Sequence, residues 1–325
     1  MKKNVAIIMG GYSSEYAISL KSGAVVKKHL KDSRYHCYGI VISEKEWVHS
    51  NDDGERYPVD KHDFSITVKG QKIVFDCVFN AIHGTPGEDG LLQAYFGLLN
   101  IPQTSCDHYQ AALTFNKRDF LSAIKPYGIK SATSYFLNYG DKIDNDEIID
   151  TVGLPCFVKA NRAGSSFGIS KVYQQQDLKD AIDKAFAEDD EIIIESFLDG
   201  TEVSVGVIRY KGNITVLPMT EIVSENDFFD YEAKYQGKSQ EITPARITSA
   251  QEQKVATIAK NIYKKLKMKG FTRSEFILVE DEPYILEMNT TPGLTEESIL
   301  PQQAKSYGLD MRQLFESAIE EALNK

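Results

Sequence analysis

The chain has 325 residues, of which 42% are hydrophobic and 10% aromatic, so it is long enough to fold into two or three compact units. Its 37 basic and 47 acidic residues give a formal net charge of −10, which argues against a nucleic-acid or an anionic-membrane partner. The cysteines are scattered without CxxC spacing, and no apolar run is long enough for a signal peptide or a membrane span. We therefore expect a soluble, cytoplasmic protein with reduced thiols.

The pattern over residues 1–115 predicts an α/β unit. Val5–Met9 is a short apolar run that ends in a Gly-Gly turn, as buried strands often do. Helical spacing follows over Ile18–Leu30, and later strand and helix candidates are Tyr38–Ile42, Val74–Ile82 and Leu91–Leu99. Strands that alternate with helices predict a parallel sheet with both faces covered.

A second α/β unit is predicted over residues 116–200. Its first element is a helix over Lys117–Tyr127. The strands and the helix expected after it are Pro155–Lys159, Ile169–Tyr173, Asp177–Phe186 and Glu191–Glu195.

The third unit is predicted over residues 201–325 and begins with runs suited to an antiparallel sheet. Its expected elements are strands at Val203–Tyr210 and Ile214–Pro218, an amphipathic helix at Gln251–Leu266, strands at Gly270–Val279 and Pro283–Met288, and a closing helix. Residues 224–246 are polar and aromatic with little periodicity. A loop of that length in a compact unit is usually functional.

Four polar side chains near the carboxyl end are predicted to share one face of a hairpin. Glu287 and Asn289 are two residues apart on one strand, as are Arg273 and Glu275 on the other, and residues two apart share a face. Such oxygen ligands suit Mg²⁺, which shares its remaining positions with phosphates, and an Arg beside it would stabilise developing negative charge. The alternative is a solvated face with ordinary cross-strand ion pairs. The polar turn at residues 290–295, which can present N–H groups to an anion, favours the site.

A loop rich in Gly and Ser after a predicted strand is a candidate phosphate cover. Lys159 ends that strand, and residues 160–168 place two glycines around two serines. N–H and hydroxyl donors in such a loop can close over phosphates, although an ordinary connection with a solvated Lys also fits. Residues compatible with an adenine slot and a carboxylate on ribose lie near the end of another strand: Glu195, Phe197, Leu198 and Glu202.

Two segments of the first unit follow predicted strands. Gly10–Glu15 lacks the GxGxxG fingerprint of dinucleotide-binding folds. Either Ser13 or Ser14 caps the next helix while Glu15 complements its dipole, or Glu15 binds an amine at the carboxyl end of the sheet. His83 also follows a strand, and this position favours a site over a purely structural role.

Together these segments resemble the D-alanine–D-alanine ligases of the ATP-grasp superfamily, nearly from end to end. The motifs that carry the resemblance are, in order, Gly10-Gly11-x-Ser13-x-Glu15, His83-Gly84-x-x-Gly87-Glu88-Asp89-Gly90, Asn116-Lys117, Val158-Lys159 with Gly164-Ser165-Ser166-x-Gly168, Tyr231-Glu232-Ala233-Lys234-Tyr235, Arg273-x-Glu275 and Glu287-x-Asn289-Thr290-x-Pro292-Gly293. The resemblance implies an α/β fold, α+β in its C-terminal part, with an N-terminal parallel-sheet domain before a two-part ATP-grasp unit. It also implies ligation of two D-alanines through an acyl phosphate, for peptidoglycan precursors, by a homodimer.

The resemblance further implies a role for each matched residue. ATP would be bound by Lys117, Lys159, Ser166, Gly168, Glu195, Phe197, Leu198 and Glu202. Two Mg²⁺ ions, or Mn²⁺ in their place, would be held by Glu275, Glu287 and Asn289. The first D-alanine would be bound by Glu15 in a network with Ser165 and Tyr235, and the second by Lys234, Ser298 and the Ile299 backbone. His83 would be a further substrate-binding residue. The oxyanion of the tetrahedral intermediate would be stabilised by Arg273 and the Gly293 N–H.

Two departures from the family pattern and two rival functions remain. Glu275 stands where the family usually has Asp, and Ala163 replaces an acidic residue often found before the Gly-Ser-Ser run. A D-alanine–D-lactate or D-serine ligase is the rival within the class, and Tyr235 favours the dipeptide product over it. A nucleotide-binding protein without catalysis is the rival from another class. This second rival is disfavoured because the chain retains Arg273, Glu287 and Asn289.

Overall fold

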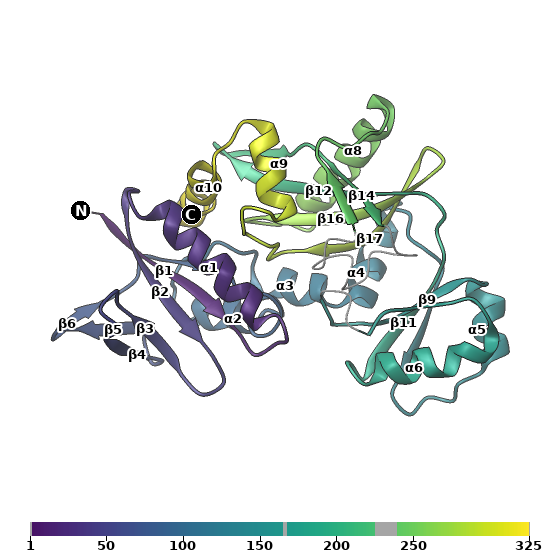
Figure 1. Ribbon diagram of the computed structural model, residues 1–325, viewed down its shortest axis with the longest axis horizontal. Helices are drawn as coiled ribbons and strands as arrows, with labels where there is room; N and C mark the ends of the chain where they lie inside the picture. The colour runs from purple at the N-terminus through teal and green to yellow at the C-terminus, as the bar shows by residue number, and fades with distance from the viewer. Residues whose placement is uncertain (1, 165–167, 225–238, 325) are drawn as a thin grey trace.

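The computed structural model describes residues 2–164, 168–224 and 239–324, whose strands form three sheets that follow one another along the chain (Figure 1). In the first, β1 (Lys3–Gly10) lies parallel to both β2 (Tyr35–Ile42) and β7 (Cys77–Asn80), and α1 (Tyr16–Leu30) connects β1 to β2. This part of the sheet has the parallel arrangement that the sequence predicts. Continuous apolar runs place β1 and β7 in the core.

The same sheet continues beyond β2 in an antiparallel extension that the sequence analysis did not predict. Its order is β6-β5-β4-β3-β2-β1-β7. The added strands have three to five residues each, so alternation within them is too short to detect: β3 (Trp47–Ser50), β4 (Arg56–Asp60), β5 (Ser65–Val68) and β6 (Gln71–Ile73). The helices that lead away from this sheet are α2 (Leu91–Leu98), α3 (His108–Phe115) and α4 (Lys117–Ile124), with a 3₁₀ turn, η1 (Lys125–Tyr127).

The second sheet is antiparallel throughout, in the order β10-β9-β11-β8. Its strands are β8 (Ser134–Asn138), β9 (Cys156–Ala160), β10 (Ser170–Val172) and β11 (Glu191–Ser196). Its apolar face packs on α5 (Asn145–Val152) and α6 (Leu178–Phe186), the latter preceded by η2 (Gln175–Asp177). The predicted strands and helix of this unit are confirmed within about two residues at each end.

The third sheet has the order β15-β14-β12-β16-β17, with β13 paired to β12. Its strands are β12 (Thr201–Tyr210), β13 (Asn213–Val216), β14 (Thr220–Ser224), β15 (Ser239–Ile242), β16 (Thr272–Val279) and β17 (Glu282–Asn289). α8 (Ser249–Lys265) starts at a capping box in which Thr248 and Gln251 bond reciprocally, and it buries Val255, Ala259 and Ile262 as its periodicity predicts.

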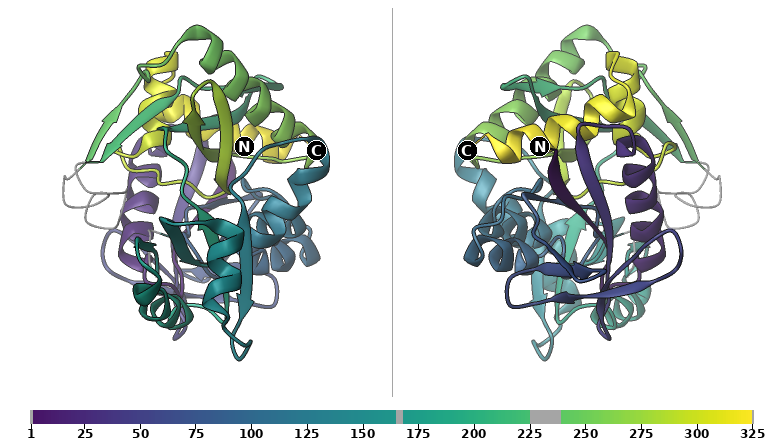
Figure 2. Two further views of the ribbon diagram at one scale, coloured as in Figure 1. Left: turned by 90° about the vertical axis from the view of Figure 1, so that its right-hand side faces the viewer. Right: turned by 90° about the vertical axis from the view of Figure 1, so that its left-hand side faces the viewer.

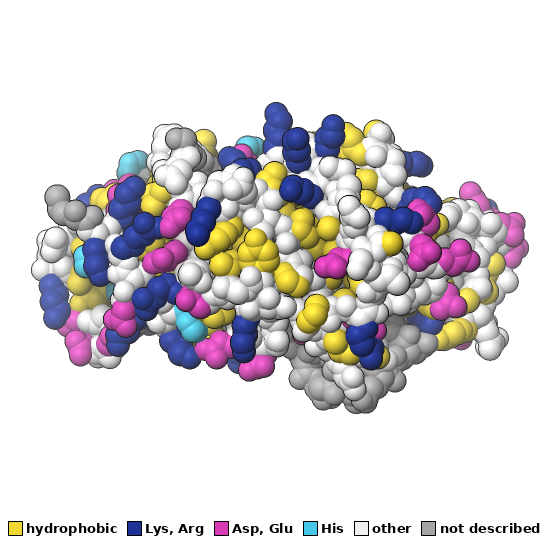
Figure 3. Space-filling model, turned by 90° about the horizontal axis from the view of Figure 1, so that it is seen from above, with side chains coloured by type: hydrophobic (Ala, Val, Ile, Leu, Met, Phe, Trp, Pro, Cys, Tyr) yellow, Lys and Arg dark blue, Asp and Glu magenta, His cyan; other side chains and the backbone are white. Residues whose placement is uncertain are grey.

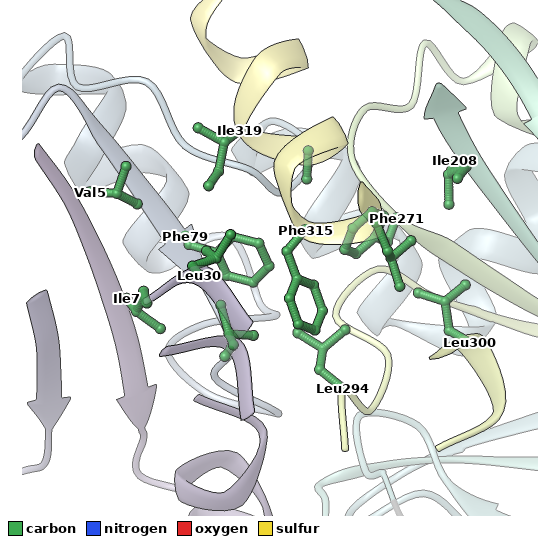
Figure 4. Close-up of a cluster of buried hydrophobic side chains, with 14 of the residues drawn as sticks. Val5, Ile7, Leu30, Phe79, Ile208, Phe271, Leu294, Leu300, Phe315 and Ile319 are labelled. Atoms are coloured by element: carbon green, nitrogen blue, oxygen red, sulfur yellow. The ribbon is translucent and has the colours of Figure 1, made fainter. Parts of the chain in front are cut away.

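Two helices follow the third sheet, α9 (Ile299–Tyr307) and α10 (Met311–Leu323), and α10 packs back against the first sheet (Figures 1 and 2). One core cluster joins Ile7 and Phe79 of the first sheet to Phe315 of α10 and to Ile208 of the third sheet (Figure 4). The first and third sheets are therefore connected by a continuous apolar seam, which we call the α10 seam.

The surface and the cysteines agree with the expectations from composition. Acidic and basic side chains are mixed over the face seen in Figure 3. Cys37, Cys77, Cys106 and Cys156 are all free thiols. None of the helices in the described ranges is both long and apolar enough to cross a membrane.

Candidate active site

The predicted convergence of four polar residues on the β16–β17 hairpin is confirmed. Glu275 lies directly opposite Glu287, and Arg273 lies opposite Asn289. Arg273 Nη2 donates to Glu275 Oε1 over 2.8 Å, and Lys117 Nζ lies 3.2 Å from Glu287 Oε2. Glu275 and Glu287 thus each face a cation in this structure. The face is a built ion-pair network, and not a set of independently solvated side chains.

A β-bulge in this hairpin brings one more residue to the same side. The register shifts between Glu275 and Phe276, because Phe276 pairs with Ile285 and Leu286 is left as the extra residue. Leu286 and its neighbour Glu287 consequently both line the same cavity. Strict alternation would have placed Leu286 on the opposite face.

This cavity, of about 430 Å³, lies between the second and third sheets. We call it the interdomain cavity. Of the residues expected to bind ATP or metal, those that line it are Lys117, Lys159, Glu195, Phe197, Leu198, Glu202, Glu275 and Glu287. Residues that lie in four separate stretches of the sequence therefore meet in one place, as the motifs predicted.

Lys159 and Glu195 form a buried ion pair in the wall of the cavity. Lys159 Nζ donates to Glu195 Oε2 over 2.8 Å, and the two side chains are 14% and 4% exposed. Burial lowers the pKa of Lys159, but the carboxylates of Glu195, Glu287 and Glu202 outweigh that effect, so its pKa lies above the ordinary value. Lys159 is therefore a fixed positive charge at the cavity. Lys117 is a second cation there, and its ammonium also donates to the Ala163 carbonyl over 2.9 Å.

Several residues of the cavity wall were not singled out from the sequence. Phe157 lies beside Phe197, with ring centroids 6.2 Å apart, and Lys171 Nζ lies 4.1 Å from the Phe197 ring. Phe157 precedes Lys159 by two residues and Ile277 follows Glu275 by two, so extending each alternation would have found both. No local pattern marked Glu221 as a cavity residue, because its carboxylate is positioned by Arg246, which lies in a distant segment of the sequence.

Glu15 lies at the junction of the first and second units. It is the N-cap residue of α1, without a side-chain capping bond. Its carboxylate closely approaches two loops, because a Cβ placed on Gly164 would lie 2.7 Å from Glu15 Oε2, and one on Gly84 would lie 3.5 Å from it. Ser13 Oγ accepts from the Glu15 N–H and donates to the His83 carbonyl, so it connects two loops of the first unit.

His83 is only 4% exposed, and both of its ring nitrogens contact protein groups. Nδ1 lies 2.8 Å from the Thr291 carbonyl, and Nε2 lies 3.0 Å from Ser22 Oγ. Nearby, Glu88 accepts from the Gly84 N–H over 3.0 Å. Burial, reinforced by the charge of Glu15, raises the pKa of Glu88 to about 8. A neutral carboxyl group therefore supports this loop at moderately acidic pH.

The end of β17 and the segment that follows it carry four of the predicted residues. The Thr291 N–H donates to Asn289 Oδ1 over 2.8 Å, which fixes the amide and leaves the second lone pair of its oxygen available. Gly293 approaches Ser298 so closely that a Cβ there would lie 2.8 Å from Ser298 Oγ. Ser298 is the N-cap residue of α9, without a side-chain capping bond, and Ile299 is the first residue of the helix, so the N–H groups at this helix start can face an anion.

Some predicted residues lie outside the described ranges, namely Ser165, Ser166, Lys234 and Tyr235. Gly168, at the end of the first of these gaps, has φ +68°, a left-handed conformation that favours glycine. It is not among the residues lining the interdomain cavity.

The polar groups of the cavity and the hairpin fit ATP and Mg²⁺. Glu195 Oε1 is buried and has no hydrogen-bond partner among the described residues, so a donor from a ligand in the cavity would satisfy it. The hairpin supplies two carboxylates and one amide oxygen, a hard oxygen set that leaves positions for phosphate and water. Over the same ranges, no group of three or more His, Cys, Asp or Glu side chains is placed to hold a metal ion.

Comparison with known proteins gives one consistent family. Residues 4–106 match the model "D-ala D-ala ligase N-terminus", and residues 124–320 match "D-ala D-ala ligase C-terminus". A protein of Flavobacterium johnsoniae named D-alanine–D-alanine ligase is 66% identical over 99% of both chains. Among solved structures, the VanG D-Ala:D-Ser ligase of Enterococcus faecalis is 31% identical with a TM-score of 0.86, covering 99% of this chain and all of that one. The D-alanyl-alanine synthetase A of Vibrio cholerae is 25% identical with a TM-score of 0.88, covering all of both. This chain belongs to the D-alanine–D-alanine ligase family.

Proposed function

We propose that this protein joins two D-alanine molecules into D-alanyl-D-alanine at the expense of ATP, which is cleaved to ADP and phosphate. The observation that carries this proposal is the hairpin face of Arg273, Glu275, Glu287 and Asn289, whose two carboxylates line the interdomain cavity together with Lys117. Enzymes that transfer phosphoryl groups combine cationic side chains with oxygen ligands for metal ions. The 66% identity to a protein named D-alanine–D-alanine ligase supports the choice of substrate.

In this proposal the ATP site is the interdomain cavity. Lys117 and Lys159 hold the phosphates as fixed charges, under a cover formed by the loop that contains Ser166 and Gly168. The adenosine is bound by Glu195, Phe197, Leu198 and Glu202. Glu275, Glu287 and Asn289 would hold two Mg²⁺ ions, or Mn²⁺. When bound, these ions neutralise phosphate charge and align the reacting oxygens.

The first half-reaction activates one D-alanine. Its ammonium is bound by Glu15 within a network that includes Ser165, Tyr235 and the His83 loop. Its carboxylate attacks the γ-phosphorus of ATP, a new O–P bond forms, the bond to the β,γ-bridging oxygen breaks, and ADP leaves. The product is an acyl phosphate, which would be lost to hydrolysis in an open site, so water must be excluded.

The second half-reaction forms the peptide bond. The carboxylate of the second D-alanine is bound by Lys234, Ser298 and the Ile299 N–H, which places its free amine beside the acyl carbon. The amine attacks, a tetrahedral oxyanion forms, and phosphate leaves with the proton that the amine loses. Arg273 and the Gly293 N–H stabilise that oxyanion, since fixed donors placed where charge develops lower the barrier.

The test is a phosphate-release assay with ATP and Mg²⁺, in which D-alanine is offered alone and with D-serine or D-lactate, and products are identified by mass. We expect D-alanyl-D-alanine as the main product. D-Serine is the second candidate for the acceptor, because a D-Ala:D-Ser ligase is 31% identical over nearly the whole chain. Turnover with none of these acids would contradict the proposal and favour a nucleotide-binding protein without catalysis.

We further propose three domains at residues 1–115, 116–200 and 201–325, in a cytoplasmic homodimer that forms through the first. The three successive sheets support the division. Leu91 and Leu98 on α2 are 62% and 83% exposed, and Tyr109 on α3 is 64% exposed, which provides apolar surface for a second copy. Sedimentation of a Leu98→Asp variant tests this, and an unchanged mass would contradict an interface at α2.

A further inference from the structure

A buried polar contact links the first unit to the turn after β17. Ser22 on α1 is fully buried, and its Oγ lies 3.0 Å from His83 Nε2 and 3.3 Å from the Leu294 N–H nitrogen. His83 Nδ1 lies 2.8 Å from the Thr291 carbonyl. Two groups of the first unit therefore hold two backbone groups of the turn, three residues apart. We call this set the Ser22–His83 clamp.

The proton positions in the clamp follow from the chemistry of its ends. The Leu294 N–H can only donate, so Ser22 Oγ accepts from it. The Thr291 carbonyl can only accept, so the proton of a neutral His83 is on Nδ1. Nε2 is then an acceptor, and the Ser22 O–H donates to it. One neutral tautomer satisfies all three contacts.

A doubly protonated His83 would break this pattern. Both ring nitrogens would donate, Ser22 Oγ would accept twice, and its own buried proton would lose its acceptor. Burial lowers the pKa of His83, and this effect is opposed by the charge of Glu15 and reinforced by that of Arg273, the charged groups that act on the ring. The direction supports the neutral ring that the contacts require.

The clamp holds the segment in which the proposed catalytic groups lie. Thr291, whose carbonyl is bound by His83, donates its own N–H to Asn289 Oδ1, so one residue connects the clamp to a proposed metal ligand. Gly293 lies between the two clamped groups, the Thr291 carbonyl and the Leu294 N–H. Its N–H is the proposed oxyanion donor, which therefore belongs to a short segment fixed on both sides.

We propose that Ser22 is a positioning residue for the ligase reaction, acting through a neutral, Nδ1-protonated His83 to fix the 291–294 turn. Since both ring nitrogens have protein partners, a direct bond from His83 to substrate would require one of them to be given up. The inference rests on the proposed function for its kinetic consequence, but the tautomer of His83 can be measured without any turnover.

The experiment compares Ser22→Ala with Ser19→Ala in the full-length protein. Ser19 is equally buried and lies one turn earlier on α1. Among the described residues, its hydroxyl bonds the Gly10 N–H and the Ala81 carbonyl, both within the first unit. Displacement of a positioned group by a fraction of an ångström to 1 Å can cost about a hundredfold in rate. We expect kcat to fall about tenfold or more in Ser22→Ala and less than about threefold in Ser19→Ala, with the KM for ATP unchanged in both. Equal losses in kcat would overturn the proposal.

A ring-nitrogen NMR spectrum of the unaltered protein, with the His83 signals assigned by their loss in His83→Gln, provides the second measurement. We expect a neutral ring protonated at Nδ1. A ring protonated at Nε2, or at both nitrogens at neutral pH, would overturn the clamp whether or not Ser22→Ala folds. If the protein ligates none of the acids tested, the proposed function fails, and the tautomer still decides the clamp.

Discussion

The α10 seam and the interdomain cavity are opposite kinds of boundary between parts of one chain. At the seam, Phe79 of the first sheet, Phe315 of α10 and Ile208 of the third sheet share one core cluster. At the cavity, the second and third sheets face each other across Lys159, Glu195 and Glu287. Among the described residues, Ile193 is the one member of the second sheet in the core cluster of the third, while the second sheet has its own core with α5 and α6.

This difference indicates that the two boundaries have different roles. Apolar burial gains free energy in proportion to the area covered, so the seam holds the first and third units as one body. The cavity wall combines apolar side chains with ion pairs, and the ion pairs can be exchanged for contacts with a charged substrate at smaller cost. We expect the second unit to move against that body when ATP binds, as the loops and domains of other enzymes close over their substrates.

The largest expected effect is the loss of turnover in Glu287→Gln. This change removes a charge from the cavity boundary without touching the seam, so phosphate release should fall about a thousandfold while the unfolding midpoint stays near that of the unaltered protein. Glu282→Gln, at the exposed end of the same strand, is the matched control and should retain full activity. Near-normal activity of Glu287→Gln would contradict the assignment of Glu287 as a metal ligand.

Phe315→Ala tests the α10 seam, the apolar boundary between the first and third units. Phe315 is fully buried, with its ring centroid 5.6 Å from that of Phe79, so truncation should lower the free energy of unfolding by about 3–5 kcal/mol. Urea unfolding measures the loss. Phe136→Ala, at a site that is 39% exposed, should cost no more than about 1 kcal/mol. A similar small loss at Phe315 would show that the seam is not a principal source of stability.

Glu195→Gln tests the fixed charge in the cavity. Without the carboxylate, Lys159 remains buried with a weaker acceptor, its pKa falls, and its attraction for phosphate weakens. The KM for ATP should rise about tenfold, equivalent to about 1.4 kcal/mol. The control is Glu191→Gln on the same strand, whose side chain is not among those lining the cavity. An unchanged KM for ATP would argue against the proposed adenosine and phosphate roles.

Glu88→Gln is expected to leave the cavity unchanged and to alter the slope of stability against pH. The pKa of Glu88 is raised to about 8 in the folded protein from an ordinary 4.5, so between these values the folded state holds a proton that the unfolded state has lost. Stability contributed by this group is therefore lost as pH rises through that window, by up to about 1.4 kcal/mol per pH unit.

Gln has no proton to lose, so its variant should become relatively more stable from pH 5.5 to 7.5, as urea unfolding at three pH values would show. The exposed Glu297→Gln should leave the slope unchanged. Parallel stability curves for Glu88→Gln and the unaltered protein would mean that Glu88 is ionised in the folded state.

What the sequence predicted and what it missed follow from the range of each contact. Alternation is a local signal, so the face shared by Glu275 and Glu287 was predictable from the two strands alone. The bulge at Leu286 breaks that local rule and has no sequence signature. The contact of Ser22 with Leu294 spans 272 residues, and a single sequence carries no information on such a pairing. Tyr235 and Ser165, expected in the substrate network, lie outside the described ranges.

The position of α10 has a consequence for how the chain is made. β1, β7 and α1 emerge from the ribosome before α10, so the apolar face that they present to Phe315 and Ile319 cannot be covered until the helix over Met311–Leu323 has been synthesised. A nascent chain that folds from its amino end would thus expose this face for most of translation. We expect a fragment of residues 1–300 to aggregate and to bind chaperones. The chain should become stable only after α10 has been synthesised.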